Sequence, residues 1–354
     1  MTDTPVAPAS GAETPTPEKV GRSKVVLHIG THKTATTTIQ DTFWENSDLL
    51  AKHGVIYPRL GRVTGHHGLA YDWANLPPIY KLEDGSEAAL RALNDTYAHQ
   101  PVTLFLSSEE FSRGDPKGAT DFAALRACLG DFDEIEVICA LRPQWEFIQS
   151  IYLEVSKHRS PPRPPALLEA ALKTHMLEGL WVDYNLLLDR LEDVFAPEEI
   201  RLFDFATQRK APGGVLGAIL AHLGVDLTAE DLTPVNGGAS NVSPRPITAW
   251  AANVLAEPTV APKWLLTLIE EAMDLEFEAS TRSCLFTREE FQAVAAHFAP
   301  ANQRLRDRRA SVQPGFDLTA ADITPLNLFR NMIPQSLWVR IGRRQTAMMI
   351  RSLD

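Results

Sequence analysis

Short apolar runs that alternate with helical patterns limit the possible folds of this chain more than any other feature. The apolar runs lie at residues 24–29, 102–106, 135–141 and 200–205. Patterns typical of helices lie near residues 36–52, 86–99, 120–130, 143–157, 180–195 and 213–223. Strands that alternate with helices predict a mainly parallel sheet with helices on both faces. We therefore expect an α/β fold, followed by a helical part beyond residue 235.

Three details of this pattern can be compared directly with a structure. Pro143 is expected at the first position of its helix, where its missing N–H would have had no partner. The breaker-rich segment "HRSPPRPP", residues 158–165, is expected to be an exposed loop. The helix over residues 180–195 is expected to place its apolar residues on one face. These residues are Leu180, Trp181, Tyr184, Leu187, Leu188, Leu191, Val194 and Phe195.

Changes in composition divide the chain into four parts. Residues 1–23 are rich in proline, threonine and alanine, and are expected to be a disordered leader. Residues 24–235 form the expected α/β core, and residues 236–325 a helical extension of the same domain. Residues 326–354 form a basic amphipathic segment, with five arginines and one acid from Arg330 onward.

Charge and cysteine usage exclude several classes of protein. The net charge of −11 over 354 residues argues against nucleic-acid binding, which needs a basic surface. The cysteines Cys128, Cys139 and Cys284 show neither zinc spacing nor a disulfide framework, which favours a reducing compartment. Because no apolar run reaches the roughly 18 residues of a membrane span, we expect a cytoplasmic protein.

The stretch "HIGTHKTATTT", residues 28–38, has the parts of a phosphate cradle. A strand that runs directly into a helix presents unpaired N–H groups, and the helix dipole favours an anion there. Thr36, Thr37 and Thr38 add hydroxyls, and Lys33 adds a mobile positive charge. Lys33 follows Gly30 by only three residues, unlike the lysine of nucleotide kinases. The shorter loop suits one terminal phosphate, unless Thr36 is only a helix cap and Lys33 a solvated charge.

A second anion-binding element is expected in "LRPQWEFIQSIY", residues 141–152. Arg142 ends a strand, and Ser150 lies two helical turns beyond Pro143. An arginine fork together with a hydroxyl suits a phosphate dianion. The alternative is an ordinary ion pair for Arg142 and a surface position for Ser150. Together with the first loop, this element indicates a ligand with two separate phosphate groups.

These two motifs resemble those of the PAPS-dependent sulfotransferases, particularly bacterial members close to the carbohydrate sulfotransferases. The resemblance covers residues 24–245 and implies a P-loop-like sheet flanked by helices. It implies a metal-free donor site for 3′-phosphoadenosine 5′-phosphosulfate (PAPS), with Arg142 and Ser150 on the 3′-phosphate. The residues expected to hold its 5′-phosphosulfate are Gly30, Thr31, His32, Lys33, Thr34, Ala35, Thr36 and Thr37. Ala35 stands where the family usually has glycine.

Sulfuryl transfer needs a cation at the departing phosphate oxygen and a general base near the acceptor. Lys33 is the expected cation. The base is expected in "GHHG", which contains His66 and His67, or at Glu109, which follows a strand end. The resemblance leaves both open, and we favour His67 and Glu109 acting together.

The expected function is transfer of a sulfuryl group from PAPS to a hydroxyl or amine of a saccharide, glycolipid or small molecule. One alternative is an ATP-dependent small-molecule kinase, and another is a degenerate nucleotide-binding module, which Ala35 would favour. The segment from Arg330 onward is expected either to pack as a terminal helix or to bring the enzyme to an anionic membrane with a lipid-linked acceptor.

Overall fold

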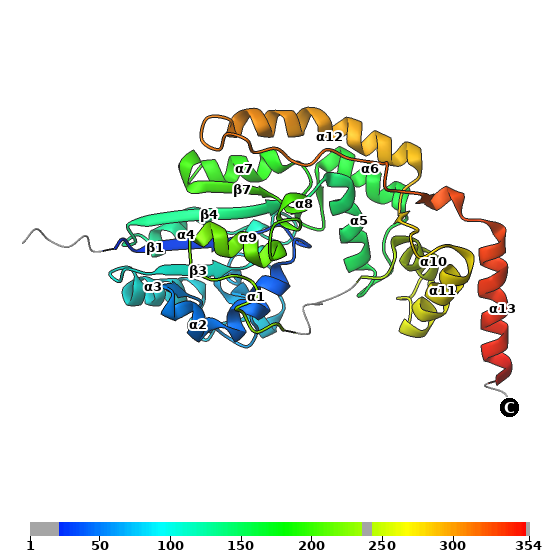
Figure 1. Cartoon of the computed structure of the whole chain (residues 1–354), viewed down its shortest axis with the longest axis horizontal. Helices are drawn as coiled ribbons and strands as arrows, with labels where there is room; N and C mark the ends of the chain where they lie inside the picture. The colour runs from blue at the N-terminus through cyan, green and yellow to red at the C-terminus, as the bar shows by residue number, and fades with distance from the viewer. Residues whose placement is uncertain (1–20, 236–242, 352–354) are drawn as a thin grey trace, which may run out of the picture.

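The computed structural model describes residues 21–235 and 243–351. Its five-stranded sheet, flanked by helices, lies in the left half of Figure 1. Every pairing in this sheet is parallel, and the strand order is β2-β3-β1-β4-β7. The strands are β1 (Lys24–His28), β2 (Val55–Ile56), β3 (Thr103–Ser107), β4 (Glu134–Leu141) and β7 (Ile200–Asp204). The predicted parallel sheet is therefore confirmed.

Both faces of the sheet are buried because its strand residues alternate between two apolar layers. Val26, Phe105 and Ile138 point into one layer, and Val25 and Leu27 into the other. The first layer is completed by α1 (Thr36–Glu45), α2 (Ser47–Lys52) and α9 (Gly214–Leu223). The second is completed by α3 (Ser86–Tyr97), α4 (Phe122–Cys128), α5 (Gln144–Val155), α7 (Tyr184–Glu192) and α12 (Arg288–Arg309). Helices on both faces confirm the predicted fold class.

The topology directs attention to one edge of the sheet. From β1 the chain passes through α1 and α2 toward β2, on one side of β1, whereas β4 leads by α5 toward β7 on the other side. The strand order thus reverses between β1 and β4, and ligands of such sheets bind at this crevice beyond the carboxyl ends of the strands. His28 lies level with Ser107 of β3 and Ile138 of β4, so these strand ends meet.

Two predicted helices have different limits in the structure. The helix predicted over residues 36–52 is divided at Asn46, whose amide donates to the carbonyl of Thr233 at 3.0 Å and thereby ties a distant loop to the break. The helix predicted over residues 180–195 is α7, which begins only at Tyr184 because the Asp183 side chain accepts from the N–H of Asn185.

Local turns explain the other corrections. Leu180–Trp181 (β6) pairs antiparallel with Met176–Leu177 (β5), because Glu178 and Gly179 both have positive φ and turn the chain back. The predicted loop over residues 158–165 ends early, since Pro164 begins α6 (Pro164–Thr174), which the sequence pattern did not predict. Pro143 is the N-cap of α5 rather than its first helical residue.

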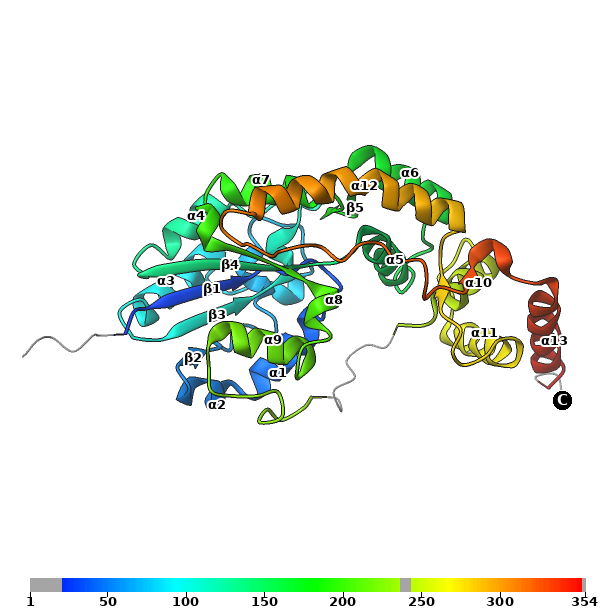
Figure 2. The same cartoon turned by 45° about the horizontal axis from the view of Figure 1, so that its top comes forward.

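The C-terminal part is helical, as predicted. Beyond α12 and a short parallel pair, β8 (Ser283–Cys284) and β9 (Leu328–Phe329), it has a second apolar cluster. That cluster joins α10 (Pro246–Ala256), α11 (Lys263–Glu276) and α13 (Gln335–Arg351) at the end of the molecule far from the five-stranded sheet (Figures 1 and 2). None of the helices described is long and apolar enough to cross a membrane. Most of the expected leader, residues 1–20, lies outside the described residues.

Candidate functional site

The loop after β1 is held in shape by its own hydroxyls and by β4. The N–H of Ile29 donates to the carbonyl of Ile138, and that of Thr31 donates to the carbonyl of Ala140, which continues the ladder beyond the strand. The hydroxyl of Thr31 also donates to Ala140, and the buried hydroxyl of Thr34 donates to the carbonyl of Thr31 at 2.6 Å. These two hydroxyls stabilise the loop itself.

The same loop presents a row of backbone donors. Lys33 and Ala35 have φ of 69° and 61°, and two left-handed residues separated by one form the kind of concave backbone that binds anions. Within the described chain, the N–H groups of residues 33–38 donate to no protein acceptor. Gly30 allows the close approach, since a Cβ there would lie 2.9 Å from His28 Nε2. This arrangement fits one phosphate or sulfate group at the start of α1.

Ala35 adopts the left-handed conformation that a glycine would adopt more easily. The alanine therefore keeps the turn that a glycine would form here, at a conformational cost of about 1 kcal/mol. Its methyl group is partly exposed and does not replace any of the backbone donors. An alanine at residue 35 therefore does not distort the loop.

Lys33 extends from this loop to α5. Its ammonium lies 2.7 Å from Glu154 Oε2, and Lys157 lies 2.8 Å from the same oxygen. Burial would raise the pKa of Glu154, but the hydrogen bonds from Lys157 and Lys33 outweigh it and lower that pKa to about 2. Glu154 is therefore ionised at any physiological pH, and it is the present partner of Lys33.

Arg142 joins the two predicted elements. Its Nη1 donates to the carbonyl of Lys33 at 2.8 Å, and its Nη2 donates to Glu146 at 2.8 Å. The guanidinium also stacks on Phe205, and its Nε is buried without a hydrogen-bond partner in the described structure. Ser150 is buried in the middle of α5, where its hydroxyl donates to the carbonyl of Phe147 and not to Arg142.

The "GHHG" segment meets the end of β3, and the structure assigns different roles to its two histidines. The N–H of Ser107 donates to His66 Nδ1, so His66 Nε2 carries the ring proton and donates to the carbonyl of Pro58. Burial lowers the pKa of His66 to about 4. His66 is thus a neutral structural residue whose two ring nitrogens are already used.

His67 and Glu109, the two predicted members of a base, come together at this edge. His67 Nδ1 lies 2.9 Å from the hydroxyl of Ser108 and 4.0 Å from Glu109 Oε2. Gln40 of α1 donates to the same carboxylate at 2.8 Å, which connects it to the anion loop's own helix. Burial would raise the pKa of Glu109, but the charges of His67 and His32 lower it further than burial raises it.

Sequence reasoning missed several polar residues at this edge. His32 was expected at the donor, but its Nε2 lies 2.9 Å from Arg113 Nη2 and 3.5 Å from Glu110 Oε1. Burial would raise the pKa of Glu110, and His32 and Arg113 lower it well below its usual range. Gln40, Glu154 and Arg113 were also missed. For Glu110 the doubled acid in "SSEEF" was a signal in the sequence. The other missed residues had none, since they reach the site through contacts between distant segments.

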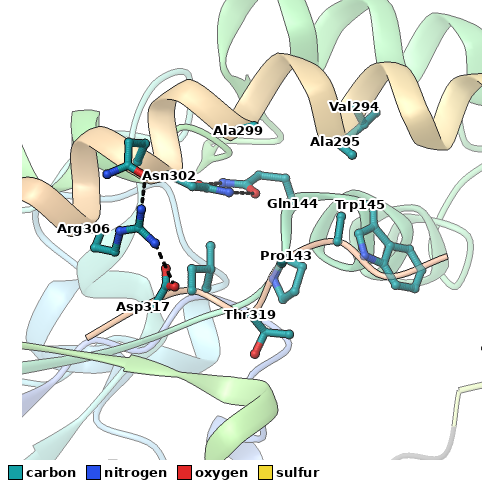
Figure 3. Close-up of a pocket in the computed structure, with 14 residues that line it drawn as sticks. Pro143, Gln144, Trp145, Val294, Ala295, Ala299, Asn302, Arg306, Asp317 and Thr319 are labelled. Carbon is teal, nitrogen blue, oxygen red and sulfur yellow. Dashed lines mark hydrogen bonds and ion pairs between the residues drawn. The ribbon is translucent and has the colours of Figure 1, made fainter. Parts of the chain in front are cut away.

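A cleft of about 330 Å³ lies beside the start of α5, between α12 and residues 317–321 (Figure 3). Its polar groups pair with one another: Gln144 and Asn302 exchange hydrogen bonds, and Arg306 lies 3.1 Å from Asp317. The cleft contains none of the predicted site residues, and its groups have no unmet charge. The loop after β1 is therefore the better candidate site. No group of three or more potential metal ligands occurs within residues 21–235 and 243–351.

Ala35→Gly should stabilise the protein slightly or leave its stability unchanged. Removing the left-handed alanine relieves about 1 kcal/mol, and the added freedom of the unfolded chain offsets part of it. Activity and anion affinity should be unchanged or raised. Ala92→Gly, at an exposed position inside α3, is the matched control and should destabilise by about 1 kcal/mol. Urea unfolding measures both, and a comparable loss at residue 35 would contradict the geometry described.

Acid should destabilise the protein through His28 and His66. Burial lowers the pKa of each to about 4, below the value of about 6.5 in the unfolded chain. The unfolded state therefore binds more protons between these two pH values, and stability is lost as the pH falls from about 6.5 to about 4. Each histidine contributes about 1.4 kcal/mol of this loss for each unit by which its pKa is lowered. Urea unfolding across this range should show a smaller loss for His66→Asn. The exposed His53→Asn should keep the full loss, and an identical pH slope in all three proteins would contradict the prediction.

Comparison with known proteins gave distant likenesses only. No model of a known family and no curated protein matches the chain. Among solved structures, it is similar to a sulfotransferase from Alicyclobacillus acidocaldarius, with 15% identity and a TM-score of 0.42 over 80% of this chain and 94% of that one. It is also similar to the sulfotransferase domain of the Synechococcus PCC 7002 olefin synthase, with 15% identity and a TM-score of 0.33 over 74% of this chain and 98% of that one. At these TM-scores, the function has to be argued from the geometry of the chain itself.

Proposed function

We propose that the protein is a sulfotransferase that moves the sulfuryl group of PAPS to a hydroxyl or amine of an acceptor. One observation carries the proposal: Arg142 Nη1 hydrogen-bonds to the carbonyl of Lys33. This bond places an arginine at the end of β4 directly beside an anion cradle at the end of β1. Two neighbouring anion sites fit a nucleotide whose ribose carries separate phosphate groups at its 3′ and 5′ positions.

The residues of each site fit the groups of the donor. The unpaired N–H groups of residues 33–38 and the exposed hydroxyl of Thr37 would hold the 5′-phosphosulfate. Arg142 would hold the 3′-phosphate, because its buried Nε is a donor with no protein partner. Ser150 can join it only by turning its hydroxyl away from the carbonyl of Phe147.

The bound donor supplies a sulfuryl group attached to a phosphate oxygen, which is the leaving group. The acceptor oxygen or nitrogen bonds to sulfur while the bond from sulfur to the phosphate oxygen breaks. Negative charge grows on that oxygen, and Lys33 with the N–H groups of the cradle stabilises it. The acceptor loses one proton in the same reaction, so a base must lie near it.

His67 and Glu109 together provide that base in this proposal. His67 accepts the proton of the acceptor, and the Glu109 carboxylate, 4.0 Å away, stabilises the imidazolium. The lowered pKa of Glu109 keeps it ionised for this role. His66 is excluded as the base because both its ring nitrogens are engaged in structural hydrogen bonds.

The two alternatives have less support. A kinase would need a longer phosphate loop than the one from Gly30 to Thr36, as well as a magnesium ligand. A degenerate binding module was favoured by Ala35, but that residue keeps the left-handed turn. The acceptor is proposed as a saccharide, a glycolipid or another small alcohol or amine. A cytoplasmic location is proposed because the three cysteines are buried free thiols.

Adenosine 3′,5′-bisphosphate should raise the melting temperature of the protein, because a ligand selective for the native state stabilises it. Adenosine 5′-phosphate, which lacks the 3′-phosphate, should give a much smaller shift, and ATP with magnesium should give none. In Arg142→Ala the difference between the first two nucleotides should largely disappear. Equal shifts from both nucleotides in the unmodified protein would reject PAPS as the donor, and labelled PAPS with candidate acceptors tests turnover directly.

The pH dependence of kcat/KM should separate the two members of the base. As the pH falls, a histidine base is protonated and loses activity before a carboxylate base does. We expect the histidine profile, with Glu109→Gln lowering the rate roughly tenfold or more without abolishing it. Gln40→Ala, which removes a hydrogen bond to Glu109 and longer ones to Ser107 but leaves both members of the base in place, should have a smaller effect. A profile that stays level below the histidine range would assign the base to Glu109 alone.

Peripheral contact with an anionic membrane through α13 is a further part of the proposal. Arg340 and Arg344 pair with Glu276 and Glu271 of α11, so packing neutralises much of the basic character seen in the sequence. Arg343 is exposed and has no ion pair with any residue that the structure describes. Beside it, the helix exposes an apolar group: Val339, Met348, Met349 and Ile350. Exposed apolar residues beside a free cation suit an anionic lipid surface.

The full-length protein should co-sediment with vesicles that contain anionic lipid at low salt, and less so as salt screens the attraction. Arg343→Glu should weaken this binding, and truncation after Pro334 should abolish it. Lys52→Glu, an exposed charge reversal on α2, is the matched control and should leave binding unchanged. A full-length protein that ignores such vesicles at low salt would refute the membrane contact.

A further inference from the structure

Helix α5 carries the counter-charges of both cations at the candidate site. Glu146, in its first turn, lies 2.8 Å from Arg142, and Glu154, in its last turn, lies 2.7 Å from Lys33. An anion in the cradle would therefore compete with a carboxylate of the protein for each cation. Lys33 is the cation that can change partners more easily, because a lysine side chain has several rotatable bonds and can move without movement of the backbone.

The backbone of Lys33 is fixed while its side chain is not. Arg142 holds the carbonyl of Lys33, and the residue has the left-handed φ of the cradle. The ammonium is only partly buried, with 22% of the side chain exposed, and Glu154 is its only ion-pair partner within the described residues. A change of partner therefore needs rotation of one side chain and the loss of one ion pair.

Glu154 does not lose its compensation when Lys33 leaves. Its Oε2 also lies 2.8 Å from Lys157, and its Oε1 lies 3.6 Å from His158. Because a carboxylate left without a cation would oppose the departure, Lys157 lowers the cost of releasing Lys33. Lys33 and Lys157 thus share the carboxylate of Glu154. Lys33 can leave it for another partner while Lys157 remains.

We propose that Glu154 is a positioning residue that holds Lys33 on α5 in the free protein, and that Lys157 retains Glu154 when Lys33 moves to an anion in the cradle. This inference deepens the proposed function and rests on the role given there to Lys33. The exchange keeps the lysine away from the leaving oxygen until the loop is filled. It also makes anion affinity depend on two residues that do not touch the anion.

The two residues should have opposite effects on affinity. Glu154→Gln removes the competing partner of Lys33, so anions should bind about two- to fivefold more tightly, the range expected of a partly exposed ion pair. Lys157→Met leaves Glu154 with Lys33 as its remaining lysine, so anions should bind more weakly by a similar factor. Glu154→Asp keeps the charge and should restore an affinity close to that of the unmodified protein.

A double-mutant cycle with Lys33→Met separates this exchange from the general effect of charge near the site. If the exchange operates, both effects should largely disappear in the Lys33→Met background. If they persist there unchanged, they arise from the electrostatic field alone and the proposal is wrong. Weaker anion binding in Glu154→Gln, in a protein that still unfolds cooperatively, would also overturn it.

Calorimetric titration of the full-length protein with two probes distinguishes this proposal from the proposed function. Adenosine 3′,5′-bisphosphate tests the nucleotide site, and inorganic pyrophosphate tests the cradle without any nucleotide. If pyrophosphate binds more tightly to Glu154→Gln and more weakly to Lys157→Met, the exchange is supported. If the bisphosphate does not bind at the same time, PAPS is rejected as the donor. If the bisphosphate binds and the cycle shows no coupling to Lys33, the exchange is rejected and the donor assignment stands.

Discussion

The hydrogen bond from Arg142 to the carbonyl of Lys33 is the contact on which the rest of the site depends. It joins the loop after β1 to the end of β4, at the point where the strand order reverses. Arg142 is itself held, because Glu146 and the ring of Phe205 fix its guanidinium and Tyr184 donates to its carbonyl. The N–H groups of residues 33–38, which follow this fixed carbonyl or belong to the same residue, donate to no acceptor in the described chain. The parallel sheet thus brings two separate strand ends together at one candidate anion site.

At the end of β3, on the other side of β1, a histidine holds the neighbouring loop. His66 binds Ser107 with both its backbone N–H and its Nδ1, and so fastens the "GHHG" segment to β3. Its neutral ring allows His67 to stand beside Glu109 without a second positive charge next to it. One histidine therefore holds the loop, whereas the other stands beside Ser108 and Glu109. Adjacent residues of one type thus have different surroundings.

The place of several candidate site residues in the fold could be predicted from the sequence, since they lie directly after strands. Lys33, Arg142 and Glu109 each follow an apolar run, and the ends of parallel strands meet at one edge. Their partners could not be predicted. Glu154 is separated from Lys33 along the chain by 121 residues and Gln40 from Glu109 by 69, so no local pattern records these contacts. The errors in helix limits have a related cause, because Asn46 and Glu178 act through a distant loop and a left-handed turn.

The sequence by itself determined the alternation of strands and helices, and the positions of the candidate anion loop and of Arg142 after strands. These follow from local rules of hydrophobic period and backbone sterics, which act over a few residues. Only the tertiary structure decided that Ala35 takes the left-handed conformation and which histidine is structural. It also decided that much of the charge of α13 is neutralised by α11, and that Lys33 rests on Glu154. The conformation of Ala35 is fixed by the turn into α1. The other three depend on the distance between groups from separate segments, and that distance is set when the elements pack.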